Sequence, residues 1–168
     1  MGISNIISNQ INSDRNIVRT MWDKLHSVPG GKKIFSKLIG RAAPYTGSID
    51  ASVEELRAGY SRITLKDKPP LRNHLDCVHA VALVNLAEVT GNLALSYSLP
   101  DNARFIVAGL SIDYIKKSRG TITGICESPL ITSSERKEYQ VVVVMTDASG
   151  ELVANATLRT LVGPKPTN

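Results

Sequence analysis

Cysteine, histidine and aromatic residues are all scarce in this 168-residue chain. It has 2 Cys, 3 His and 5% aromatic residues. Two cysteines cannot build a disulfide scaffold, and a zinc site would need ligands of other types. The histidines and acids show no metal-ligand spacing, and Gly30-Gly31 lacks the preceding strand of a phosphate-binding loop. We therefore expect neither a metal nor a cofactor.

The basic excess is confined to one segment. The formal net charge is +5, and residues 1–41 hold seven basic and two acidic residues, whereas the other 127 carry 13 of each sign. This segment has one Trp and one Phe, so platforms for stacking nucleic-acid bases are scarce. We expect no nucleic-acid partner. A helical extension packed on the main domain is favoured over a membrane-surface helix, which needs more apolar surface.

Long hydrophobic runs are limited to residues 78–97. Twenty residues could span a bilayer, but Asn85, Glu88 and Asn92 interrupt the run, and a carboxylate in mid-span is costly in lipid. The run therefore predicts a buried helix and no stable membrane insertion. No basic segment precedes an apolar signal region, so a cytoplasmic location is expected.

The rest of the pattern predicts an α+β fold. Residues 1–42 read as a basic helical extension, with a short helix around Ile6–Ile11 and a second helix at 14–26 capped by Ser13. Residues 43–168 then form the main domain, with one or two strands in 53–66, the central helix, and four strands linked by compact turns at 119–120 and 147–150. Such a curved antiparallel sheet wrapped around a helix leaves an edge free, which predicts a homodimer or a dimer of dimers.

The segment from Arg72 to Glu88 contains the main candidate functional residues. Polar residues precede the apolar helix, whose first N–H groups suit a developing oxyanion. An apolar helix does not bury Glu88 without a partner or a purpose: either it acts as a general base, or it faces a water-filled interface or a basic residue. Nine residues separate His79 from Glu88, about 13.5 Å and about 180° of helix. The two side chains therefore act together only if they come from different subunits.

Two motifs in this chain resemble those of a known family. Asn73-x-x-Asp76-x-x-His79-Ala80-Val81 followed by Leu86-Ala87-Glu88 is similar to the N-x-x-G-x-x-H-G-G … L-A-D/E signature of hotdog-fold acyl-CoA thioesterases of the phenylacetate-pathway type. Residues 111–120, which end in Lys116-Lys117-Ser118-Arg119-Gly120, resemble the third strand and turn of that family. The resemblance covers about residues 43–163 and points to an uncharacterised thioesterase-like branch.

The resemblance implies a hydrolase for acyl-CoA or a related thioester, with sites formed across a dimer interface. Glu88 would be the general base or nucleophile from the opposite subunit, and the backbone N–H of Ala80 would hold the thioester oxygen. Asn73 would position the water or the carboxylate, and His79 would line the site. The substrate-binding candidates are Val81, His74, Asp76, Lys116, Lys117 and Arg119.

Four positions depart from the family pattern. Ala80-Val81 replaces two glycines, which narrows the place for an oxyanion, and Asp76 puts a negative charge where glycine is usual. Val107 stands where some relatives have Ser or Thr. The departures at Ala80, Val81 and Asp76 favour the alternative function, a non-catalytic protein of the same fold that binds acyl thioesters or fatty acyl groups.

Overall fold

The structure is a computed structural model that describes residues 15–166. The short helix expected around Ile6–Ile11 and the Ser13 cap lie outside these residues. The helix expected at 14–26 is α2 (Ile17–Leu25), and its N-cap is Asn16, whose side chain accepts a hydrogen bond from the Arg19 N–H at 3.0 Å.

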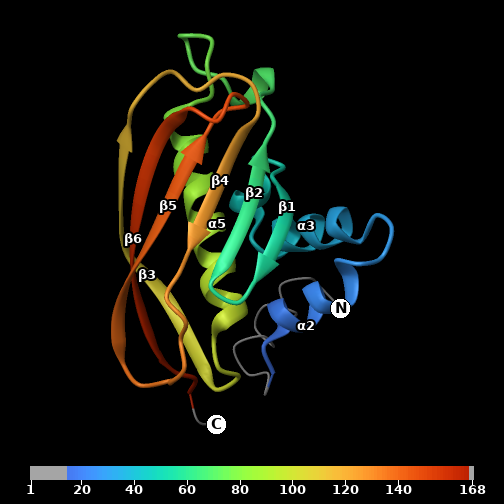
Figure 1. Cartoon of the computed structure of the whole chain (residues 1–168), viewed down its shortest axis with the longest axis vertical. Coiled ribbons are helices and arrows are strands. Elements are labelled where there is room, and N and C mark those ends of the chain that lie inside the picture. The colour runs from blue at the N-terminus through green and yellow to red at the C-terminus, as the bar shows by residue number, and fades with distance from the viewer. Residues whose placement is uncertain (1–14, 167–168) are drawn as a thin grey trace.

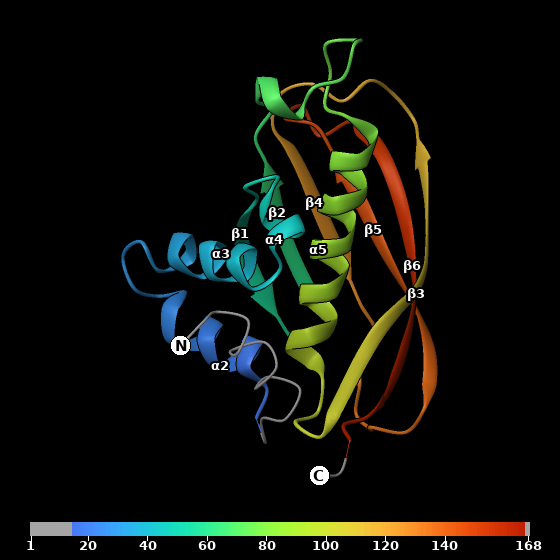
Figure 2. The same ribbon diagram turned by 180° about the vertical axis from the view of Figure 1, so that it is seen from behind.

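A six-stranded antiparallel sheet forms the main layer (Figure 1). Its order is β1-β2-β4-β5-β6-β3. The strands are β1 (Ser52–Arg57), β2 (Tyr60–Leu65), β3 (Ala103–Tyr114), β4 (Ile122–Glu127), β5 (Lys137–Thr146) and β6 (Leu152–Pro164). The sheet curves around one long helix, α5 (Ala80–Ser98), which confirms the predicted α+β fold (Figure 2).

One connection differs from the prediction. The turn at 119–120 was expected to join neighbouring strands, but β3 pairs with β6 at the far edge of the sheet and β4 pairs with β2 and β5. The chain between β3 and β4 passes the start of α5, where the Val78 N–H donates to the Ser118 carbonyl at 2.8 Å. The turn at 147–150 does join two neighbours, β5 and β6.

The core lies between α5 and the concave face of the sheet. Leu86 and Leu95 of α5 are fully buried, as are Val143 and Leu158 of the sheet. A Cβ on Gly124 of β4 would lie 2.8 Å from a side-chain oxygen of α5, so this glycine allows the helix to approach the sheet closely. The helix is held to the sheet chiefly by apolar burial.

The N-terminal helices cover one edge of the sheet. Helix α3 (Gly31–Ala42) leads into the one-turn helix α4 (Pro44–Gly47) and lies beside β1, and α2 packs on α3 and α5 (Figure 2). Phe35 of α3 is fully buried and makes an edge-to-face contact with Trp22 of α2. The helical segment thus shares the core, and its division from the main domain at residue 42 stays a prediction.

Helix α3 also satisfies the backbone of the edge strand. The Val53 N–H of β1 donates to Ser36 Oγ at 2.9 Å, and Lys32 Nζ donates to the Glu54 carbonyl at 2.6 Å. At the opposite edge, no strand of residues 15–166 lies beyond β3. The covered edge and the open edge therefore differ in their capacity to pair with another strand.

Candidate functional site

The loop before α5 is a tight structure organised by Asn73. Arg72 and Val78 form a bridge that closes the loop, and the Asn73 N–H donates to the Cys77 carbonyl at 2.9 Å. Asn73 Oδ1 accepts from the Leu75 N–H at 2.9 Å and from Cys77 Sγ at 3.3 Å. The amide oxygen of Asn73 therefore holds the loop, and its Nδ2 group is the part that remains to contact a ligand.

Asp76 has a backbone conformation that glycine adopts easily, which explains why the related signature has glycine at this position. Its φ is +53°, in the left-handed region that glycine adopts freely and aspartate tolerates. Its carboxylate accepts from Arg72 Nη1 at 2.8 Å, and Arg72 also binds Asp67. The negative charge expected beside a thioester is therefore compensated by Arg72.

Asp67 connects this loop to the turn after β3. One carboxylate oxygen lies 2.7 Å from Arg72 Nε, and the other accepts from the Gly120 N–H at 3.1 Å. The hydrogen bond from Arg72 is the main cause that lowers the pKa of Asp67. The ionised form thus holds both segments in place at neutral pH.

The start of α5 leaves one backbone donor free. The His79 side chain accepts from the Val81 N–H at 3.1 Å, and the His79 carbonyl accepts from the N–H groups of Ala82 and Leu83. Within the described chain, the Ala80 N–H donates to no protein group. A free N–H at the positive end of a 19-residue helix suits an anionic oxygen.

A hollow of about 220 Å³ lies beside this donor, and we call it the helix-start hollow. Its lining brings together four predicted residues, Asn73, Ala80, Lys116 and Lys117. Sequence reasoning missed two others. Tyr114 donates from its hydroxyl to the Ala80 carbonyl at 3.2 Å, and Ser118 is buried with no hydrogen-bond partner for its hydroxyl among the described residues.

The three cations of the turn after β3, Lys116, Lys117 and Arg119, differ in their partners. Lys116 forms ion pairs with Asp147 at 2.7 Å and with Glu151, which raise its pKa. Arg119 donates to the carbonyls of Asp76 and Leu75 at 3.3 and 3.5 Å. Lys117 is exposed and makes no ion pair within residues 15–166, so it is the cation best able to receive a phosphate.

The other predicted residues lie apart from this hollow. His79 and Val81 line a second hollow of about 150 Å³ on the α4 side of the helix start, together with Tyr45 and Asn85. His74 is exposed in the loop. The structure therefore places His79 and Asn73 in different hollows, on either side of the helix start.

Glu88 lies farther along α5. It is partly exposed, between the buried residues Ala87 and Val89, and makes no hydrogen bond or ion pair within the described residues. It follows Ala80 by eight residues, about 12 Å along the helix axis. In one chain its carboxylate is too far from the Ala80 N–H for both to act on the same carbonyl group.

The described part of the chain has neither a metal-binding cluster nor a membrane-spanning helix. Residues 15–166 contain no group of three His, Cys, Asp or Glu side chains arranged to hold a metal ion. No helix among them has the length and apolar character needed to cross a membrane.

Solved structures share this fold over most of the chain. The crystal structure named genomics APC5556 is 28% identical with a TM-score of 0.75, over 88% of this chain and 97% of that one. A Pseudomonas aeruginosa protein of unknown function, described as a probable thioesterase, is 21% identical with a TM-score of 0.71, over 82% and 97%. A Haemophilus influenzae thioesterase is 14% identical with a TM-score of 0.69, over 82% and 93%.

The curved antiparallel sheet, its central helix and these neighbours show that the chain has the hotdog fold. The chain belongs to the family described as Domain of unknown function (DUF4442), whose model matches residues 31–162. That match begins inside the helical segment and includes all of α3. No curated protein matches the sequence significantly.

Proposed function

We propose that the protein is a thioesterase that hydrolyses acyl-CoA, or a related acyl thioester, at sites shared between two subunits. The observation that carries this proposal is the Ala80 N–H, which is unpaired within the described chain at the start of α5 and lies beside the helix-start hollow. Neighbours with the same fold are named thioesterases, which supports the reaction class.

The proposed chemistry needs an oxyanion donor and a base. The Ala80 N–H receives the thioester carbonyl oxygen as negative charge develops on it. Glu88 removes a proton from water, whose oxygen attacks the carbonyl carbon, and the C–S bond then breaks. The proton on Glu88 passes to the leaving thiolate, so the products are a carboxylic acid and a free thiol. The alternative role of Glu88 is direct nucleophilic attack.

The distance between these groups requires a second subunit. Tyr114 and Ile115 line the helix-start hollow at the end of the open edge strand β3, and they are 48% and 56% exposed. A copy paired along β3 would lie beside the hollow, cover these side chains and bring its own Glu88 to the site. We therefore propose a homodimer joined through β3.

A dimer of dimers is a further proposal. The face of the sheet opposite α5 exposes Ile106, Val142 and Leu161, at 65%, 47% and 42%. These residues come from β3, β5 and β6, which are adjacent strands. Exposed apolar residues on neighbouring strands are typical of an interface.

The alternative function is binding of an acyl thioester without hydrolysis. One specific observation favours it: the Val81 N–H is already engaged by His79, so only the Ala80 N–H remains at this position. A single donor gives less oxyanion stabilisation than a pair. This alternative predicts saturable binding with no turnover.

A free-thiol release assay separates the two functions. The wild-type protein is expected to release coenzyme A from at least one member of a panel of acyl-CoA chain lengths. Glu88→Ala should abolish release without changing the unfolding midpoint. The conservative variant Glu88→Gln should behave in the same way, because an amide cannot accept the proton. Release by both variants at the wild-type rate would remove the role given to Glu88, and no release by the wild type would favour the binding function.

A further inference from the structure

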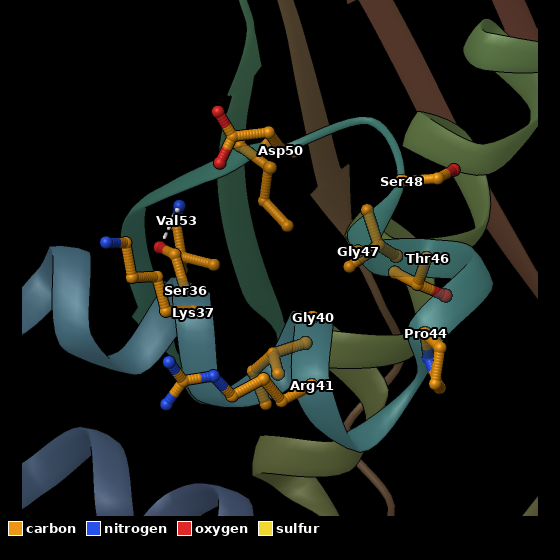
Figure 3. Close-up of a pocket in the computed structure, with 14 residues that line it drawn as sticks. Ser36, Lys37, Gly40, Arg41, Pro44, Thr46, Gly47, Ser48, Asp50 and Val53 are labelled. Carbon is orange, nitrogen blue, oxygen red and sulfur yellow. Dashed lines mark hydrogen bonds between the residues drawn. The ribbon is translucent and has the colours of Figure 1, made fainter.

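A larger hollow lies on the opposite side of the molecule from the open edge of β3. It has a volume of about 520 Å³ and lies between α3, α4 and the start of β1 (Figure 3). Ile63 of β2 and Val89 of α5 also belong to its lining. We call it the α3–α4 hollow. Its size is within the range of small-molecule sites.

Small side chains create this space. A Cβ on Gly47 would lie 2.4 Å from the Gly40 carbonyl oxygen, so α4 crosses α3 with backbone nearly against backbone. Ala51 and Ser36 line the wall where larger side chains would fill it. The hydroxyl oxygen of Ser36 accepts a hydrogen bond from the Val53 N–H (Figure 3). This bond anchors the α3 wall of the hollow to the sheet.

The rim carries positive charge. Lys37 and Arg41 of α3 line the hollow, and neither makes an ion pair within residues 15–166. Together with Lys33 they form a row of cations spaced four residues apart, on a helix that contains no acidic residue. Like charges at this spacing destabilise a helix, and a bound anion between them would relieve that repulsion.

Asp50 is the acidic residue of the lining. Its carboxylate lies 2.5 Å from Lys68 Nζ, and this hydrogen bond is the main cause that lowers its pKa. Lys68 is therefore the main partner of Asp50, and the charges of Lys37 and Lys33 lower the Asp50 pKa to a smaller extent. With Arg41 also at the rim, positive charge exceeds negative charge around the hollow. Because Asp50 repels a second negative charge, a monoanion suits the rim better than a dianion.

Part of the lining is both apolar and accessible. Ile39, Pro44 and Ala51 line the hollow and keep part of their surface exposed, whereas Val53, Ile63 and Val89 are almost fully buried. An apolar wall beside a cationic rim matches a molecule with an alkyl chain and one anionic head group. A free phosphate lacks the chain, and a fatty alcohol lacks the charge.

We propose that the α3–α4 hollow binds a medium-chain carboxylate, with its alkyl chain on Ile39, Pro44 and Ala51 and its carboxylate between Lys37 and Arg41. The site is separate from the helix-start hollow and shares no lining residue with it. The proposal does not depend on thioesterase activity, because binding of the carboxylate is measured directly.

Calorimetry of the full-length protein with sodium dodecanoate tests the site. The wild type should bind the probe saturably, and Arg41→Gln and Lys37→Gln should each weaken binding about tenfold, because each removes one charge-assisted hydrogen bond. Lys33→Gln is the matched control on the same helix, since Lys33 does not line the hollow, and it should bind like the wild type. Ala51→Leu should weaken binding by filling the space.

Two further sets of measurements identify the chemical class of the ligand and the hollow that binds it. Dodecanol should bind at least tenfold more weakly than dodecanoate, and dodecyl phosphate should not bind more tightly. Ala80→Pro, which alters the helix-start hollow, should bind dodecanoate normally. The proposal is overturned if dodecanoate does not bind, if Lys37 and Arg41 can be neutralised without effect, if dodecanol binds equally well, or if Ala80→Pro abolishes binding. Thermal melts of each variant verify that the chain is folded.

Discussion

His79 Nδ1 accepts a hydrogen bond from the backbone N–H of Val81 at 3.1 Å. This contact makes His79 the N-cap of α5 and gives the residue a structural role in addition to its proposed place in the site. It also leaves the Ala80 N–H as the free donor at this helix start within the described residues, since the N–H groups of Ala82 and Leu83 bond to the His79 carbonyl.

Replacing His79 tests the capping role. His79→Ala should lower the free energy of unfolding by about 1 kcal/mol, the usual cost of losing an N-cap. His79→Asn should recover most of that loss, because asparagine caps helices well. Urea unfolding measures both variants. If His79→Asn is as stable as the wild type but has lost kcat, the imidazole contributes to the chemistry directly.

The ion pair of Asp67 with Arg72 should make the stability depend on pH. The folded-state pKa of Asp67 lies below its ordinary value of 3.8, so the carboxylate stabilises the fold above pH 3.8 and this contribution disappears as the pH falls through the folded-state value. At pH 7, Asp67→Asn should therefore cost about 1 kcal/mol. The difference between variant and wild type should shrink as the pH falls below 3.8 and through the folded-state pKa of Asp67, as followed by thermal melts. A difference that stays constant with pH would contradict this assignment.

The bond between Ser36 and Val53 should protect the edge of the sheet. Ser36→Ala removes the acceptor for the Val53 N–H and should cost about 1 kcal/mol. Hydrogen exchange at the Val53 amide should become faster. Exchange at the amide of the buried Ile63 should change only as much as the global free energy of unfolding changes. Unchanged exchange at Val53 would show that the edge is protected by another means.

The crossing of α3 and α4 should not tolerate a methyl group. Gly47→Ala places a Cβ 2.4 Å from the Gly40 carbonyl oxygen and should destabilise the protein by about 1–3 kcal/mol, as overpacking does. Gly163→Ala is the matched control, because its Cβ would meet Arg136 at an ordinary 3.5 Å. Equal melting temperatures for the two variants would mean that α4 moves freely away from α3.

Local sequence patterns predicted the elements well and the connections less well. The apolar run at 78–97 corresponds to α5, because a helix buried on nearly all sides is apolar all round. The sequence predicted one or two strands in 53–66, where β1 and β2 lie, and four strands after the central helix, which are β3 to β6. The place of β3 was not predictable from the turn at 119–120, because strand order depends on where the chain passes α5, at the contact between Val78 and Ser118.

The candidate site was only partly visible in the sequence. The signature led to Asn73 and Ala80, which the fold brings to one hollow. It could not reveal that Lys116 is paired with Asp147 and Glu151, because these acids lie more than 30 residues further along the chain. The α3–α4 hollow left no signal either, since small residues such as Gly47 form no periodic pattern.

A subunit-mixing experiment tests the shared site most directly. Ala80→Pro removes the proposed oxyanion donor at a position where proline is favoured, and the preceding residue already has the extended backbone, ψ +139°, that proline requires. Ala80→Pro and Glu88→Ala should each be inactive in thiol release when pure. After exchange of subunits, the mixture should regain activity, because a heterodimer has one site with both Glu88 and the Ala80 N–H. A mixture that exchanges subunits and stays inactive, while the wild type cleaves thioesters, would contradict a site formed from two chains.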